Sequence, residues 1–173
     1  MTPPSMQHRV VRMDNAKYHG GAFKTAPDLI VWHCTASHSP KQTMAYLNSG
    51  EKRASYHYLI DRDGMIYRFC SPALVAYHAG ISAWLPPPVG RESVNKRSLG
   101  VAFANRNLPG YPLTAEQTES ALWLGVTLMR LYKIPATHNV AHREVAPGRK
   151  TDPLPETLDM NQWRLTLSRA AAA

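Results

Sequence analysis

The chain has 173 residues, of which 44% are hydrophobic and 18% are charged, a composition that fits one globular domain and excludes a disordered or fibrous protein. Its 20 Lys and Arg residues outnumber its 12 Asp and Glu residues, so the formal net charge at pH 7 is +8. Such a charge favours a polyanionic partner, but it does not distinguish nucleic acid, anionic lipid and an acidic cell-wall polymer.

The N-terminal sequence and the distribution of apolar residues predict a soluble protein made in the cytoplasm. A secretory signal needs an apolar stretch of about 7 to 15 residues, which the N-terminus lacks. No stretch reaches the roughly 20 apolar residues of a membrane-spanning helix. The two cysteines, Cys34 and Cys70, are too few for a disulfide framework and allow one bridge at most.

The first third of the chain predicts a buried strand followed by a short helix. Residues 1–26 are polar and contain Pro-Pro and Gly-Gly pairs, so we expect an irregular segment with one short strand or helix. The apolar, β-prone run at residues 29–35 predicts a buried strand with His33 near its end. Ser39 and Pro40 then supply the N-cap and the first residue of a short helix.

Residues 56–70 predict a β-hairpin, because two β-prone runs flank a turn that ends in Asp-Gly. Side chains alternate along a strand, so Tyr56 is expected on the same face as Tyr58 and Ile60. Residues 71–97 contain several prolines and predict a long surface excursion, of the kind that shapes a binding site when it is ordered.

The second half of the chain predicts one more buried strand, at residues 98–104, and two helices. Thr114 and Gln117 form a capping box that starts a long helix with a broad apolar face. A last, basic amphipathic helix is expected over residues 156–169, packed on the sheet rather than lying on an anionic membrane. Strands that alternate with helices, together with the hairpin, predict an α/β fold with a central mixed β-sheet flanked by helices.

Three side chains of types that zinc accepts are spread along the chain: His33, His142 and Asp152. A catalytic zinc site normally takes three protein ligands and leaves a fourth position for water. This triple is weak evidence by itself, because the chain has eight histidines and a lone histidine in a strand is more often a hydrogen-bonded core residue. Lys150 strengthens it: one residue separates Lys150 from Asp152, so both project to the same side of an extended segment, where a cation can stabilise the oxyanion of a carbonyl addition.

Five blocks of sequence occur in a fixed order along the chain: VWHCTAS at 31–37, SYHYLIDRDGMIYRF at 55–69, AYHAG at 76–80, NKRSLGVAF at 95–103 and AHREVAPGRKTDP at 141–153. Together they resemble the zinc-dependent N-acetylmuramoyl-L-alanine amidase family, which includes phage amidase lysozymes, bacterial cell-wall amidases and animal peptidoglycan recognition proteins. The resemblance covers about residues 28–153 and implies a central mixed sheet, flanking helices and a zinc ion at the base of a substrate groove.

The resemblance implies a role for each matching residue. His33, His142 and Asp152 match the zinc ligands of the family, although many relatives have a cysteine where this chain has Asp152. Lys150 matches the basic residue that stabilises the oxyanion. Tyr56 matches the tyrosine that phage lysozymes place beside the metal water, where it would orient the water or pass its proton.

Three further residues, His78, Trp84 and Asn95, lie in blocks or loops that would line the groove and are candidates for substrate binding. For each of them, structural hydrogen bonding or packing explains the residue equally well.

The implied reaction is hydrolysis of the amide bond between the lactyl group of muramic acid and L-alanine in peptidoglycan. Cytoplasmic recycling relatives use a glutamate where this chain has Ala102, so the pattern favours a phage or prophage endolysin that acts on the cell wall after the inner membrane is opened. The alternatives are a bacterial recycling or cell-wall-remodelling amidase and a non-catalytic peptidoglycan-binding protein, and retention of the whole residue set argues against the last.

The expected partner is therefore peptidoglycan, with Zn²⁺ as the cofactor. We expect a monomer in which residues 1–173 form a single catalytic domain, with its core in residues 28–153. The basic surface predicts weak electrostatic contact with an anionic cell envelope. No basic stripe with interleaved aromatic residues indicates specific binding of nucleic acid.

Overall fold

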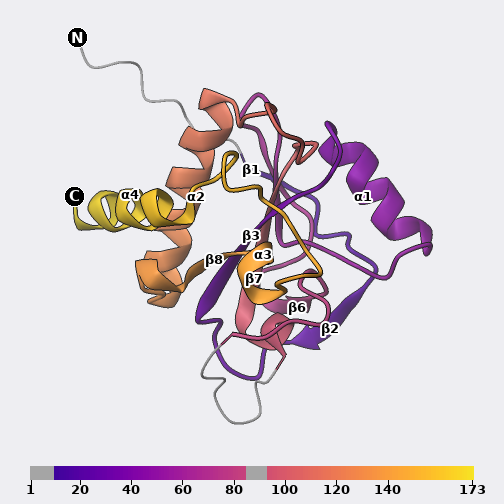
Figure 1. Cartoon of the computed structure of the whole chain (residues 1–173). Helices are drawn as coiled ribbons and strands as arrows, with labels where there is room; N and C mark the ends of the chain where they lie inside the picture. Colours follow the sequence, from indigo (N-terminus) through magenta and orange to yellow (C-terminus); the bar gives the residue numbers. More distant parts are fainter. Residues whose placement is uncertain (1–9, 85–92) are drawn as a thin grey trace.

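A six-stranded mixed sheet forms the centre of the computed structural model, which describes residues 10–84 and 93–173 (Figure 1). Its strands are β1 Val10–Arg12, β3 Leu29–Cys34, β4 Tyr58–Ile60, β5 Ile66–Arg68, β7 Ser98–Phe103 and β8 Asn139–Ala141. Their order across the sheet is β1-β5-β4-β7-β3-β8, in which β4 and β5 are antiparallel and the other neighbours are parallel. A separate pair joins β2 His19–Ala22 to β6 Leu74–Ala76. The predicted mixed sheet is confirmed.

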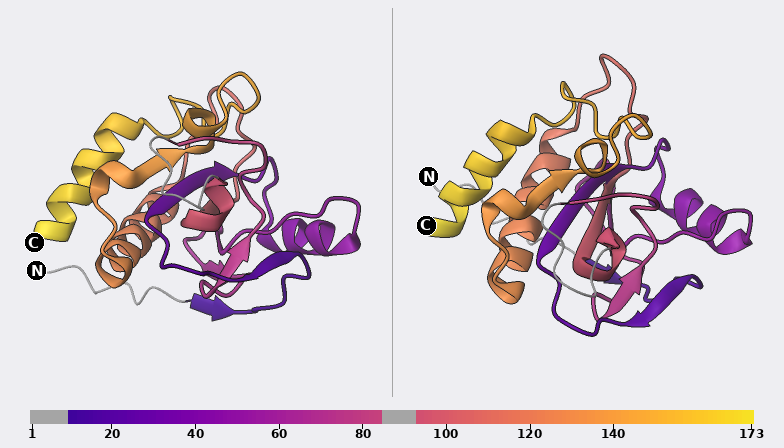
Figure 2. Two further views of the ribbon diagram at one scale, coloured as in Figure 1. Left: turned by 90° about the horizontal axis from the view of Figure 1, so that it is seen from below. Right: turned by 60° about the horizontal axis from the view of Figure 1, so that its bottom comes forward.

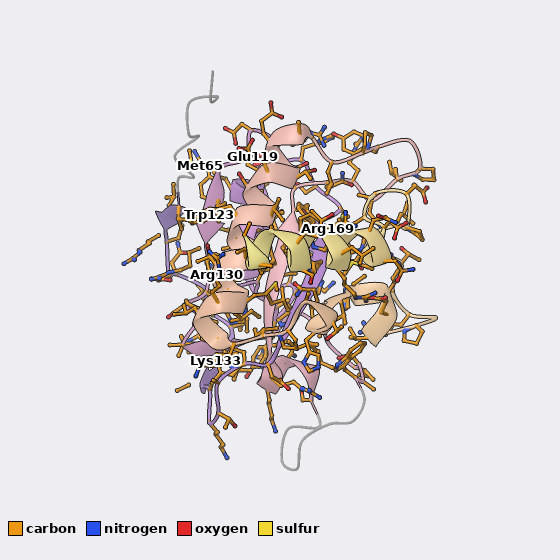
Figure 3. The ribbon with its side chains drawn as sticks, turned by 90° about the vertical axis from the view of Figure 1, so that its left-hand side faces the viewer. Met65, Glu119, Trp123, Arg130, Lys133 and Arg169 are labelled. Carbon is orange, nitrogen blue, oxygen red and sulfur yellow. The ribbon has the colours of Figure 1, made fainter. Side chains whose placement is uncertain are left out.

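Helices lie on both sides of the sheet. The α-helices in the described ranges are α1 Pro40–Ser49, α2 Ala115–Tyr132, α3 His142–Val145 and α4 Met160–Ala172, and the 3-10 helices are η1 Val94–Arg97 and η2 Ala136–His138. Figures 1 and 2 show α2 and α4 together on one side and α1 on the opposite side. Figure 3 looks onto α2 and α4, with Trp123 and Arg130 labelled on α2 and Arg169 on α4. None of the described helices has the length and apolar character needed to cross a membrane.

Strand β3 divides the core in two, because successive side chains of a strand point to opposite faces. Ile30 and Trp32 pack into the large cluster under α2 and α4, where the Trp32 ring meets that of Trp163 edge-on at 5.4 Å. Leu29 and Val31 face the other way, toward α3 and η1. His33 continues this second series, so its ring emerges on the face that α2 and α4 leave uncovered.

The two predicted N-caps are confirmed, because Ser39 and Thr114 each accept a hydrogen bond from the backbone N–H three residues later. The last helix, predicted over residues 156–169, starts later. The carboxylate of Asp159 accepts hydrogen bonds from the two N–H groups that follow Met160, and α4 therefore begins at Met160.

The sequence patterns do not predict several of the short strands. The N-terminal segment contains both β1 and β2, and the predicted surface excursion at residues 71–97 contains β6 and η1. Tyr56 also departs from the prediction: it packs with Leu59 and Phe69 rather than on the face of Tyr58 and Ile60. Regular strand geometry starts only at Tyr58, so alternation does not extend back to Tyr56. Cys34 and Cys70 are both buried free thiols.

Replacing Leu167 by Ala should lower the free energy of unfolding by about 2 to 5 kcal/mol, because the side chain is fully buried between α4 and α2 and its removal leaves a cavity. Leu165→Ala on the same helix removes a half-exposed side chain and should change the free energy by less than about 0.5 kcal/mol. Urea unfolding of both variants checks this. Equal losses would show that α4 is not packed as described.

Candidate active site

Two neighbouring parallel strands deliver the two histidines of the site. His33 is near the carboxyl end of β3, and His142 directly follows the carboxyl end of β8. Since β3 and β8 run in parallel register, with Trp32 opposite Ala141, the two rings come together with their centroids 4.4 Å apart. Asp152 reaches the same point from the loop after α3. Side-chain donor atoms of the three residues all lie within 4.8 Å of one another.

The carboxylate of Asp152 sits between the two rings. Its Oδ1 lies 3.1 Å from Nδ1 of His142, and its Oδ2 lies 3.6 Å from Nδ1 of His33. The backbone N–H of Cys34 donates to Oδ2 at 3.2 Å. Burial by itself would raise the pKa of Asp152, but the contacts with His142 and His33 outweigh it and hold the pKa well below its usual range. The carboxyl group is therefore ionised.

Nδ1 of His33 faces this carboxylate. The residue is fully buried, and its Nδ1 has no hydrogen-bond partner among the described residues. Burial, then the neighbouring His142 and finally the charge of Lys150 lower the pKa of His33 to about 4. A buried, neutral imidazole nitrogen without a hydrogen-bond partner, next to an ionised carboxylate, is suited to binding a cation. Two imidazole nitrogens and one carboxylate oxygen are the donor set of a three-ligand catalytic metal site.

The opposite ring nitrogens are held by the protein, as is usual for histidines that bind metals. Nε2 of His142 lies 3.1 Å from the carbonyl oxygen of Ala79, and Nε2 of His33 lies 3.0 Å from Nδ1 of His78. Both candidate ligands thus point Nδ1 toward Asp152.

His142 and Asp152 line a cavity of about 540 Å³, whereas the fully buried His33 lies behind them. Tyr56 and Lys150 also line it, as do three basic side chains that the sequence analysis did not single out: Lys52, Arg53 and Arg149. Lys52 and Arg53 follow α1 in a charged loop that matches no recognised motif, and only their place beside the cavity suggests a role. Arg149 donates to the carbonyl oxygens of Ala79 at 2.6 Å and Ile81 at 2.7 Å.

Tyr56 lies against His33, with the ring centroids 5.1 Å apart. Loss of hydration, followed by the negative charge of Asp152, raises the pKa of Tyr56 above its usual range. The phenol therefore stays neutral at ordinary pH and can donate a hydrogen bond into the cavity.

The three predicted substrate-binding residues occupy different places. Asn95 and His78 line the cavity, but His78 is buried and both of its ring nitrogens bond within the chain. Trp84 is not among the residues that line the cavity, and packs instead beside Val31 and Val145. Contact of these three residues with a substrate stays a prediction.

Known proteins are similar to this chain in sequence and fold. A family model described as N-acetylmuramoyl-L-alanine amidase matches residues 23–155. The 1,6-anhydro-N-acetylmuramyl-L-alanine amidase AmpD of Escherichia coli K12 is 30% identical over 135 residues, which cover 78% of this chain and 70% of that protein. Other AmpD proteins are matched over about half of their length, for example 52% for those of Salmonella typhimurium SL1344 and Citrobacter freundii.

Two solved structures illustrate the similarity of fold. E. coli AmiD, in complex with the substrate anhydro-N-acetylmuramic acid-L-Ala-D-gamma-Glu-L-Lys, has a TM-score of 0.67 and 27% identity, over 85% of this chain and 61% of that chain. The endolysin amidase LysCS of Clostridium intestinale has a TM-score of 0.68 and 24% identity, over 92% of this chain and 95% of that chain, and supports the fold alone.

Asp152→Asn removes the charge that draws a cation between the rings while keeping the size of the side chain. It should weaken Zn²⁺ binding by more than the roughly 10- to 100-fold cost of losing an outer contact to a ligand. Isothermal titration measures this. His19→Ala, at an exposed histidine outside the group, is the control and should leave the affinity unchanged. Equal affinities for wild type and Asp152→Asn would contradict the assigned site.

Proposed function

The chain belongs to the N-acetylmuramoyl-L-alanine amidase family, and we propose that it uses a zinc ion to hydrolyse the amide bond between the lactyl group of N-acetylmuramic acid and L-alanine in peptidoglycan. The observation that carries this proposal is the group formed by His33, His142 and Asp152, of which His142 and Asp152 line an open cavity. The unpartnered Nδ1 of His33 supports zinc in particular, because zinc readily takes two imidazole nitrogens and a carboxylate oxygen. When bound, the ion would act as a Lewis acid that activates water and polarises the amide carbonyl.

Lys150 is the candidate for stabilising the oxyanion. The residue lines the cavity next to Asp152, and its backbone N–H is anchored to the carbonyl oxygen of Ala146 at 3.0 Å. Attack on the amide carbon places a negative charge on the former carbonyl oxygen. A fixed cation in a partly dehydrated cavity stabilises that charge more than water does.

Proton transfer falls to Tyr56 or to solvent. Asp152 is the only acidic residue among the described residues that line the cavity. On β7, Ser98, Gly100 and Ala102 lie on the face of His33, and none of them has a titratable side chain. Because Tyr56 stays neutral, it orients water or the substrate by donating a hydrogen bond, and does not act as an anionic base in its resting form.

The cavity suits an acidic peptide. Lys52, Arg53, Arg149 and Lys150 line it, and the stem peptides of peptidoglycan carry free carboxylates. Opposite charges at the mouth of a cleft raise the rate of encounter. We therefore place the stem peptide on the basic side of the cavity, with the amide bond at the base.

For the biological role we propose a phage or prophage endolysin, made in the host cytoplasm and acting on the cell wall after the membrane is opened. Two features support the endolysin role. The net charge of +8 favours adhesion to an anionic envelope, and Ala102 has a methyl group in place of a carboxylate. A recycling or remodelling amidase is the second candidate, supported by the sequence identity with AmpD. The retained donor set and cavity speak against a protein that only binds peptidoglycan.

Replacing Lys150 by Ala should lower kcat by about 10² to 10³, because the oxyanion loses its cation. Tyr56→Phe keeps the ring but removes the hydroxyl, and should lower kcat by about 10² or more. Both variants should retain zinc in a metal analysis, since neither residue supplies a ligand. Lys24→Ala, at an exposed lysine away from the cavity, serves as the control. If both variants kept the wild-type kcat, the proposed catalytic roles of Lys150 and Tyr56 would be wrong.

The activity itself is tested by counting new N-terminal L-alanine groups released from purified sacculi. Release should stop with a chelator and return with zinc. An endolysin should show a higher kcat/KM on sacculi than on soluble anhydro-muropeptides, and a recycling enzyme the reverse. Absence of release from both substrates by the zinc-loaded protein would overturn the proposed amidase function.

A further inference from the structure

The loop after β6 contains two consecutive residues, His78 and Ala79, that contact the two histidines of the metal site. Nδ1 of His78 lies 3.0 Å from Nε2 of His33. The carbonyl oxygen of Ala79 lies 3.1 Å from Nε2 of His142. One short segment therefore touches both candidate ligands on the side away from Asp152.

His33, His78 and Ser98 form one series of hydrogen bonds, here called the His33 branch, which ends at the backbone carbonyl of Val94. The hydrogen positions in this branch can be assigned by starting from Val94. The Ser98 hydroxyl lies 2.6 Å from the carbonyl oxygen of Val94, which can only accept, so the hydroxyl hydrogen must point there. Ser98 Oγ is then left to accept from Nε2 of His78, 3.1 Å away.

The same reasoning extends to the ligand. A neutral imidazole carries one N–H, so a hydrogen on Nε2 of His78 leaves Nδ1 as an acceptor. That acceptor takes the hydrogen on Nε2 of His33. The only nitrogen of His33 without a hydrogen is then Nδ1, which faces Asp152.

His142 reaches the same state in a single step. The carbonyl oxygen of Ala79 can only accept, so in the neutral ring Nε2 of His142 carries the hydrogen, and Nδ1, 3.1 Å from Oδ1 of Asp152, is the nitrogen that a metal would take. His33 reaches a backbone carbonyl only through two side chains. This makes the His33 branch the one that side-chain substitutions can break.

Two further residues hold the segment in place. Oδ1 of Asn95 accepts hydrogen bonds from the backbone N–H groups of His78 at 3.2 Å and Ala79 at 2.8 Å. Gly100 leaves room for the ring, since a Cβ at this position would lie 2.5 Å from Cγ of His78. Any side chain at residue 100 would push the His78 ring away from β7.

We propose that His78 and Ser98 are positioning residues that keep the Nδ1 lone pair of His33 directed at the metal. We call the hydrogen-bonded series of His33, His78, Ser98 and the carbonyl group of Val94 the relay. Asn95 aligns this relay with the carbonyl group of Ala79, which orients His142. His78 and Asn95 then support the metal ligands instead of binding substrate. The inference rests on the proposed metal site, but the hydrogen positions can be measured without metal or substrate.

The first test is an imidazole ¹H–¹⁵N correlation spectrum of the zinc-free protein at pH 8, with the His33 signals assigned by their loss in His33→Gln. We expect the hydrogen of His33 on Nε2 and that of His78 also on Nε2. A hydrogen on Nδ1 of either residue in the wild-type protein overturns the proposal, and this measurement needs no destabilising variant.

The second test compares zinc affinities by competition with a coloured chelator. Ser98→Ala should weaken binding by about 10- to 100-fold and give His33 a mixture of hydrogen positions. Ser120→Ala is the matched control, because Ser120 is equally buried and donates its hydroxyl to the carbonyl oxygen of Gly64 at 2.7 Å, away from the site. Affinity of Ser98→Ala within twofold of the control contradicts the relay.

A third comparison separates positioning from packing. His78→Asn keeps an acceptor near the place of Nδ1 and should retain more zinc affinity than His78→Leu, which has a similar size and no acceptor. Equal losses of zinc affinity in His78→Asn and His78→Leu would contradict the proposed relay. A protein with the expected hydrogen positions and zinc affinity that releases no L-alanine termini would refute the proposed function and leave the relay standing.

Discussion

The largely buried carboxylate of Asp152 is the constraint on which the site depends. An ionised group in this position costs several kcal/mol unless it is compensated. The fold supplies one backbone N–H, from Cys34, and two imidazole rings whose near nitrogens point at the carboxylate. Side-chain donor atoms of the three residues lie within 4.8 Å of one another, close enough to hold one metal ion. The arrangement has the donor set of a candidate metal centre, and the surrounding elements hold it in place.

The sheet accounts for how these residues meet. Parallel neighbours place their carboxyl ends at the same edge, so the end of β3 and the residue after β8 are adjacent although more than half the chain separates them. Helices α2 and α4 cover the opposite face and bury Trp32, which fixes the face to which His33 points. The cavity consequently forms on the side of α1 and α3, where loops contribute Tyr56 and Lys150 and η1 contributes Asn95.

The long elements and the candidate ligands could be predicted from the sequence, for different reasons. Strand β3 has a continuous apolar run and helix α2 has a broad apolar face and a capping box, so the local sequence is sufficient to predict both. His33, His142 and Asp152 were selected by their chemistry together with the resemblance of five blocks to a family, since spacing alone was weak evidence. Strands β6 and β8 were missed because each has three residues and is defined by a partner distant in sequence. The surroundings of His78 depend on β6, so its burial could not be foreseen. The predicted face of Tyr56 was wrong because regular strand geometry begins only after this residue.

Anomalous diffraction at the zinc absorption edge from crystals of the zinc-loaded protein would locate the metal in this group of residues. We expect one strong peak at about 2.0 to 2.2 Å from Nδ1 of His33, Nδ1 of His142 and a carboxylate oxygen of Asp152, with a remaining position open to the cavity. A peak elsewhere, ligation through Nε2 of either histidine, or the absence of zinc from this group at saturating concentration would contradict the proposed metal site.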